Sequence, residues 1–309
     1  MAMRASVFSR RTLRQGAIVS AGGSVRIKLL LSCCVFFTLI ALASRAAWFM
    51  EWKQQNSSPL HQPSLHRKGY TILINTWKRN DLLMQSVSHY SSCPGLDSIH
   101  IVWSEPDPPS VSLVEYLKNV IHSRLRHGRR IELKFDINTE DSLNNRFKEL
   151  TDSRTDAVFS IDDDVIFPCS SVEFAFNIWR SAPDTMVGFV PRVHWIDQSK
   201  GNADKYIYGG WWSVWWMGTY SMVLSKAAFF HRKNCEDIAM SFLVANATNS
   251  PPIWVQGKIF EIGSTGISSL GGHSEKRTHC VNRFVAEYGR MPLVSTSVKA
   301  VDSRGIWFW

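Results

Sequence analysis

The chain has 309 residues, of which 45% are hydrophobic and 20% are charged. These proportions are typical of a globular protein and exclude a disordered chain, a collagen-like chain and a membrane protein with many spans. The formal net charge is +9, but six cationic side chains lie within residues 1–28, before the first acidic residue, Glu51. The charge that remains elsewhere is too small to indicate a nucleic-acid partner, and we expect none.

The first 50 residues predict a membrane anchor. A basic segment, residues 1–28, precedes a mostly apolar segment, residues 29–50, which is long enough to cross a bilayer. Positive charge before the span and almost none after it predicts a cytoplasmic tail and a lumenal body, which is type II topology. A cleaved signal peptide that ends at Ala43 is the alternative. Residues 51–68 are polar and contain proline, which predicts a flexible stem.

Residues 69–309 predict one lumenal α/β domain. Short apolar segments predict strands at residues 69–75, 98–103, 131–135, 156–161 and 220–224. Apolar residues at helical spacing predict helices at residues 81–90, 112–125 and 237–245. The alternation of strands and helices predicts a mostly parallel sheet with helices on both faces.

Cysteines and glycosylation sequons bear on the prediction that the domain is lumenal. An oxidising lumen allows disulfides among Cys93, Cys169, Cys235 and Cys280, and the spacing leaves their pairing open. The absence of a CxxC pattern gives no indication of a zinc site. Asn56 and Asn246 begin N-x-S/T sequons and are candidate glycosylation sites.

Three consecutive aspartates, Asp162, Asp163 and Asp164, follow the strand predicted at 156–161. Ligands of parallel α/β sheets bind at the carboxyl ends of strands, and adjacent carboxylates repel one another unless a cation shares them. Because side chains alternate along an extended chain, Asp162 and Asp164 can face one ion while Asp163 points elsewhere. Oxygen ligands favour Mg²⁺ or Mn²⁺ over Zn²⁺. A solvated turn is the alternative interpretation.

Six segments resemble, in order, the exostosin-like glycosyltransferases of the GT64 type: ILINTWKRNDLL, SIDDDVIF, FAFNIWRSAPDTMVGFVPR, YSMVLSKAAFF, NCEDIAMSFLVAN and KRTHCVNRFVAEYGRMPL. The resemblance runs from about Tyr70 to Leu293. It implies a GT-A fold, a nucleotide-sugar donor and transfer of a hexose with retention of configuration. With one anchor and a single catalytic domain, the chain is most similar to members of the Golgi membrane that transfer mannose from GDP-mannose to glycosylinositol phosphorylceramide sphingolipids.

The resemblance also implies roles for residues on the donor side. The donor diphosphate is expected to bind Mn²⁺, or Mg²⁺, through the aspartates. Asp164 and Asp162 are the expected metal ligands, and Asp162 and Asp163 are also expected to contact the donor. Arg79 in TWKRND and Asn75 are the other expected donor-binding residues.

On the acceptor side, the resemblance implies that Asn234 and Asp237 of NCED lie near the reacting sugar. Asp237 is expected to stabilise charge at the anomeric carbon or to orient the acceptor hydroxyl. Arg277 in KRTHC is expected to stabilise the leaving nucleotide. The resemblance further implies a Cys235–Cys280 disulfide, which would bring Asp237 and Arg277 into one site.

A cluster of tryptophans and one departure from the family need separate interpretations. Trp211, Trp212, Trp215 and Trp216 form either a sugar-stacking or lipid-facing platform or part of the core.

In the family a helix-containing stretch precedes NCED, whereas here His231-Arg232-Lys233 runs directly into Asn234. The chain is therefore expected to be shortened there.

Two alternative functions stay open. In the first, the enzyme uses a UDP-sugar to transfer an N-acetylhexosamine to a glycan; in the second, the chain is a shortened, non-catalytic anchored subunit. The sequence also leaves open whether the chain assembles with itself or with another subunit.

Overall fold

The structure is a computed structural model that describes residues 27–40, 69–124, 129–148, 150, 153–198, 205–224, 227–231, 237–263 and 273–305. The chain divides into two compact units, Met1–Ser64 and Leu65–Trp309. In the first unit the described residues form one helix, at 27–40, whose residues are all exposed. Among the described residues, no helix combines the length and the apolar character that a bilayer span needs. The rest of the predicted anchor, residues 41–50, lies outside the described residues.

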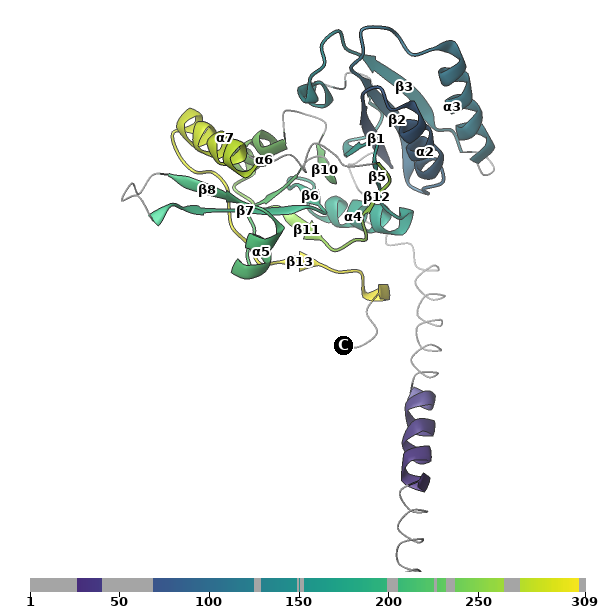
Figure 1. The fold of residues 1–309 in the computed structure, drawn as a ribbon, viewed down its shortest axis with the longest axis vertical. Helices are drawn as coiled ribbons and strands as arrows, with labels where there is room; N and C mark the ends of the chain where they lie inside the picture. Colours follow the sequence, from purple (N-terminus) through teal and green to yellow (C-terminus); the bar gives the residue numbers. More distant parts are fainter. Residues whose placement is uncertain are drawn as a thin grey trace, which may run out of the picture. The chain divides into compact units, whose positions relative to one another are not determined.

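An eight-stranded sheet forms the centre of the second unit, with the order β13-β11-β6-β10-β4-β1-β2-β3 (Figure 1). Its strands are β1 (Tyr70–Thr76), β2 (Leu96–Trp103), β3 (Glu132–Ile137), β4 (Ala157–Asp162), β6 (Val187–Gly188), β10 (Ala227–His231), β11 (Ile253–Val255) and β13 (Lys299–Ala300). Strand β10 runs antiparallel to β4 and β6, and the other neighbours are parallel. The predicted, mostly parallel α/β sheet is therefore confirmed.

Alternate residues of the central strands enter two separate cores, because side chains of a strand alternate between the faces of a sheet. Ile72 and Ile74 of β1 share one core with helices α2 (Asn80–Tyr90), α3 (Val111–Arg124) and α4 (Cys169–Ser181). Leu73 shares the other core with α5 (Trp211–Met217) and α6 (Asp237–Thr248). Helices cover both faces, as predicted, and all residues of β1 are buried.

Smaller elements complete the second unit. Strands β7 (Pro191–Ile196), β8 (Tyr206–Gly209) and β9 (Met222–Val223) form an antiparallel sheet, and β5 (Val165–Ile166) pairs with β12 (Phe260–Glu261). Helix α7 (His273–Tyr288) contacts β8 and α6. The 3-10 helices η1 (Leu143–Phe147) and η4 (Ser303–Gly305) lie within the described part of this unit. The sequence did not predict α4, α5 or α7.

Candidate donor and acceptor sites

The three aspartates occupy the carboxyl end of β4. Asp162 is the last residue of β4, and Asp163 and Asp164 form the turn that leads into β5. The Asp163 amide donates to the carbonyl oxygen of Asn75 at 3.2 Å, which holds the turn against the end of β1. The Asp163 side chain is fully buried, whereas those of Asp162 and Asp164 are 20% and 21% exposed. One carboxylate is thus hidden and two are accessible.

Two arginines pair with these carboxylates. Arg79 lies 2.5 Å from Asp163 (Nη2 to Oδ1) and 2.9 Å from Asp164 (Nη1 to Oδ2), and the buried Arg146 of η1 pairs with Asp162. Three carboxylates and two guanidiniums leave one negative charge when all are ionised. A bound divalent cation would reverse the sign of that charge, which suits an anionic diphosphate.

Asp163 differs from its neighbours in its electrostatics. Burial raises its pKa to about 6, although a hydrogen bond from Thr76 Oγ1 at 2.7 Å and the Arg79 charge oppose the rise. The charges of Asp164 and Asp162 raise this pKa further. Since Thr76 and Arg79 already engage both of its oxygens, Asp163 shapes the turn and leaves the accessible Asp162 and Asp164 as the candidate metal ligands. Their hard oxygen donors fit Mg²⁺ or Mn²⁺.

The position of Arg79 depends on α2, which begins at the next residue. The other end of α2 is attached to the chain that follows the aspartates. Tyr90 Oη donates to the Val165 carbonyl at 3.1 Å and accepts from the Phe167 amide at 2.9 Å. His89 Nε2 lies 2.8 Å from the Phe167 carbonyl. These contacts fix α2, and with it Arg79, to the segment that carries Asp163 and Asp164.

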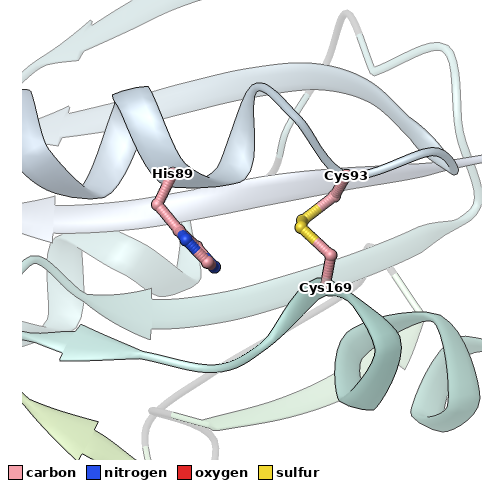
Figure 2. Close-up of side chains that lie close together, drawn as sticks. All are labelled: His89, Cys93 and Cys169. Carbon is pink, nitrogen blue, oxygen red and sulfur yellow. A yellow bond between two sulfur atoms is a disulfide. The ribbon is translucent and has the colours of Figure 1, made fainter.

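A disulfide completes this attachment. Cys93, just beyond α2, is bonded to Cys169, the first residue of α4. Figure 2 shows His89 beside this bond, and ligand atoms of the three residues all lie within 4.8 Å of one another. Metals bind the thiolate form of cysteine, so two sulfurs that are bonded to each other make a structural link rather than a metal site. The sequence had left the pairing of these cysteines open.

Asn75 occupies the end of β1, as expected for a donor-binding residue. It is 7% exposed, and its Oδ1 has no hydrogen-bond partner among the described residues. Asn75 is in register with Asp162 across the β1–β4 pair, so the two side chains project from the same face of the sheet. A buried acceptor without a partner is unusual and is available to a ligand.

The expected acceptor-side residues lie on α6 and α7. Asp237 is the first residue of α6, and the next residue, Ile238, packs in one cluster with Tyr208 and Val281. Arg277 precedes Val281 by one turn of α7. The backbone at Asp237 therefore lies near the part of α7 that carries Arg277. Arg277 Nη1 donates to Tyr208 Oη at 3.2 Å.

Several predicted residues lie outside the described part of the chain. These are Asn234, Cys235 and Asn56. Cys280 forms no disulfide with any described residue, so the Cys235–Cys280 pair stays a prediction. Asn246 is exposed on α6, where its Oδ1 accepts from Arg290 Nη2 at 2.8 Å, and its glycosylation also stays a prediction.

The tryptophan cluster forms the exposed helix α5. Its core contact is Val214, while Trp212 and Trp216 are 78% and 83% exposed. The helix borders a groove of about 1040 Å³ whose lining is mostly apolar and includes Trp195, Ile196, Ile207, Trp212, Trp215 and Trp216. An exposed apolar patch of this kind marks an interaction surface, which favours the platform over core packing.

Sequence reasoning missed Arg146 and Tyr208. Arg146 contacts Asp162 from a 3-10 helix, and no sequence pattern links these two residues. Tyr208 meets Arg277 only because β8 packs on α7. The segment GFVPR, which carries the resemblance to the family, contains Arg192, and Arg192 also contacts Tyr208.

The chain is similar to known glycosyltransferases over most of its length. The glycosyl transferase family 64 domain matches residues 70–233 and 232–306. Glycosylinositol phosphorylceramide mannosyl transferase 1 of Arabidopsis thaliana is 64% identical over an alignment of 303 positions that covers 91% of this chain and 90% of that protein. Exostosin-2 of Homo sapiens is 31% identical over an alignment of 268 positions that covers 77% of this chain and 35% of that protein.

A solved structure is also similar in part. It is mannosyltransferase PcManGT from Pyrobaculum calidifontis in complex with GDP-Man and Mn²⁺, with 15% identity, a TM-score of 0.34 and coverage of 50% of this chain and 45% of that chain. A likeness this small carries no conclusion about the fold or the site.

The comparisons also bear on the departure before NCED. The two segments that match the family meet at residues 232–233. The alignment with the Arabidopsis protein has 303 positions, whereas 91% of 309 residues is about 281, so about 22 positions have no counterpart here.

The family match begins at β1, ends after β13, and includes the three aspartates, both arginines that pair with them, and Arg277. The chain therefore belongs to glycosyl transferase family 64.

Proposed function

We propose that this chain is a metal-dependent, retaining mannosyltransferase that transfers mannose from GDP-mannose to glycosylinositol phosphorylceramide in the Golgi membrane. The observation that carries the proposal is its 64% identity with the Arabidopsis mannosyl transferase over nearly the whole of both chains. The aspartates at the carboxyl end of β4, in a sheet of the kind that a GT-A domain contains, support a donor site at that edge.

On the donor side, Asp162 and Asp164 would hold a Mn²⁺ or Mg²⁺ ion, because they are the accessible carboxylates. The ion, when bound, would neutralise negative charge on the donor diphosphate. Arg79, fixed by α2 and 39% exposed, would donate hydrogen bonds to the same phosphate oxygens. The unpartnered Oδ1 of Asn75 would accept a hydrogen bond from the donor.

On the acceptor side, Asp237 would stabilise positive charge at the anomeric carbon or orient the acceptor hydroxyl, with Asn234 beside it. Arg277 would stabilise the leaving nucleotide. Support comes from the cluster that contains Ile238, Tyr208 and Val281, because it brings the start of α6 near Arg277. A guanidinium keeps its charge at any physiological pH, which suits a residue that must meet an anionic leaving group.

Location follows the same reasoning. The apolar segment 29–50 would anchor the chain as a type II protein, with residues 51–68 as a stem. The Cys93–Cys169 disulfide supports an oxidising lumen for the domain. The exposed tryptophans of α5 would face the bilayer, where indole rings prefer the interface and where a sphingolipid acceptor lies.

The test is transfer by the full chain in detergent micelles with Mn²⁺. GDP-mannose and a panel of UDP-sugars are offered with inositol phosphorylceramide acceptors and glycan acceptors. We expect turnover of GDP-mannose with the sphingolipid acceptor and loss of turnover with a chelator. Turnover of only a UDP-sugar would instead assign an N-acetylhexosaminyltransferase.

A second candidate is a shortened, non-catalytic subunit, which the absence of about 22 positions found in the Arabidopsis protein favours. Its signature would be a folded chain that binds GDP with Mn²⁺ but transfers no sugar. Size measurement of the solubilised chain would show whether it associates with itself.

A further inference from the structure

Strand β3 forms an open edge of the eight-stranded sheet (Figure 1). Among the described residues it pairs only with β2, in parallel. The Asn138 amide donates to the Trp103 carbonyl at 2.8 Å, so the even-numbered residues along β3 direct their backbone groups to β2. The amides and carbonyls of Leu133, Phe135 and Ile137 therefore point away from the sheet. An edge of this kind is a template for a further strand.

The side chains at this edge alternate between charged and apolar residues. Residues 130–136 read R-I-E-L-K-F-D, so the charges alternate in sign from the exposed Arg130 to Asp136 along one face of the strand. Leu133 and Phe135, on the opposite face, pack against the core that contains α3. Edges that stay unpaired are often protected by lysines, which repel a second copy. Two opposite signs in alternation do not give that protection.

The charges of this edge are only loosely engaged within the chain. Glu132 lies 3.5 Å from Lys134 and 3.3 Å from the half-exposed Arg154. Asp136 lies 3.5 Å from His100, and its side chain is 38% exposed. Ion pairs of this length between partly exposed groups are weak, so these carboxylates can accept further partners.

We propose that two copies of this chain pair through β3, antiparallel, about a two-fold axis that passes through Leu133. Arg130 then lies opposite the partner's Asp136, and Glu132 lies opposite the partner's Lys134. Symmetry makes each of these pairs occur twice, and cross-strand pairs of opposite charge stabilise a sheet. None of these residues is among those proposed to bind donor or acceptor, so the dimer does not depend on the proposed function.

Both rows of side chains select this register. Leu133 meets its own copy and Ile131 meets the partner's Phe135, so apolar residues pair with apolar residues through the outward backbone groups. An axis moved by one residue would set Lys134 opposite its own copy, which is repulsive. An axis moved by two residues, to Phe135, would set Glu132 opposite a neutral asparagine. The axis at Leu133 gives every charge from 130 to 136 an opposite partner.

Apolar surface is also uncovered next to this edge. A pocket of about 520 Å³ lies beside the start of β3, and its lining includes Ile121, Ile131 and Leu133. Because Ile131 opposes the partner's Phe135 in the dimer, the second strand would pass beside this pocket and remove part of its apolar lining from water.

The test uses charge reversals in the full chain in detergent micelles, with the mass of the protein measured by sedimentation velocity. The unmodified chain should dimerise at micromolar concentration. Glu132→Lys sets lysine opposite lysine, and Lys134→Glu sets glutamate opposite glutamate, so we expect each variant alone to dimerise about 10-fold more weakly or worse. Asp184→Lys is the matched control, because it makes the same change of charge at an exposed residue beyond α4 and should dimerise normally.

A mixture of the two reversals tests direct contact. In a pair formed by one copy of Glu132→Lys and one copy of Lys134→Glu, each substituted position faces an opposite charge. We expect the equimolar mixture to recover the affinity of the unmodified chain, measured with a fluorescent label on one variant. A folding defect in either variant could not produce this recovery.

A cysteine at the two-fold axis tests the register. Leu133→Cys, in a chain that also carries Cys33→Ala/Cys34→Ala, sets the new thiol opposite its own copy. Cα atoms of such a pair lie about 5.5 Å apart, within disulfide range. Mild oxidation should therefore cross-link this variant and not Phe135→Cys in the same background.

The remaining outcomes overturn the proposal. These are an unmodified chain that stays monomeric, a dimer that both reversals leave intact, a mixture that stays monomeric, and cross-linking through Phe135→Cys in place of Leu133→Cys. A dimer that survives both reversals would form through another surface.

Discussion

The attachment of α2 to the start of α4 makes a specific prediction about stability. The Cys93–Cys169 disulfide links residues 76 positions apart. Closing a loop of that length in the unfolded chain corresponds to about 4.5 kcal/mol on the loop-entropy relation, and measured losses on removing native disulfides are about 2–5 kcal/mol. We expect Cys93→Ala/Cys169→Ala to lower the free energy of unfolding by about 4 kcal/mol. Urea unfolding of the full chain, followed by tryptophan fluorescence, measures this change.

The control is Cys33→Ala/Cys34→Ala, which removes two exposed cysteines that form no disulfide. We expect its unfolding midpoint to match that of the unmodified chain. The hydrogen bonds of Tyr90 and His89 still hold α2 in the first variant, so its affinity for GDP with Mn²⁺ should fall by no more than about 3-fold while folded. An unfolding midpoint equal to that of the control would show that the disulfide is absent or does not constrain the unfolded chain.

Three further predictions concern the site, the pH dependence and the tryptophans. Asp164→Asn should weaken Mn²⁺-dependent GDP binding by more than about 10-fold, whereas the exposed Asp184→Asn should not, and equal affinities would contradict the metal assignment. Burial lowers the pKa of His194 to about 4, so His194 takes up a proton at a higher pH in the unfolded chain than in the folded chain. The free energy of unfolding therefore falls as the pH falls from about 6.5 toward 4. His194→Gln should remove up to about 3 kcal/mol of that loss, measured as melting temperature against pH with the exposed His122→Gln as control. Trp212→Ser/Trp216→Ser should leave the urea midpoint unchanged and slow transfer to a membrane-embedded acceptor but not GDP-mannose hydrolysis, and equal transfer rates would refute a lipid-facing role.

The positions of the residues proposed for the donor side could be predicted from the sequence because their signals are local. An apolar strand that ends in three aspartates needs only the rule that parallel strands present ligands at their carboxyl ends. The alternation of side chains also indicated that Asp163 would turn away from Asp162 and Asp164, and it is the buried member of the three. Arg79 followed from the resemblance, and the structure places it against two of these carboxylates.

The remaining contacts could not be predicted, because they depend on how distant elements pack. Arg146 reaches Asp162 from η1, and the Cys93–Cys169 bond depends on α2 and α4 meeting. Likewise, Tyr208 is placed by the register of the β7–β8 pair, which sets it opposite His194, and by the packing of α7 on β8. A shift of the register by one residue would turn Tyr208 to the opposite face, away from both arginines.

The shortened segment before Asn234 falls between two elements that the chain retains. Ala228 of β10 and Met240 of α6 belong to the same core as Val158 of β4. The sheet and the helix that flank the missing positions therefore still pack together, and the aspartates at the end of β4 are held by β1 and α2, on the other side of β4 from β10. The shortening consequently concerns the segment next to α6, where Asn234 and Asp237 are proposed to act on the acceptor side. Binding of GDP with Mn²⁺ should be unaffected by it, so any loss of activity in this chain should appear in the transfer step and not in donor binding.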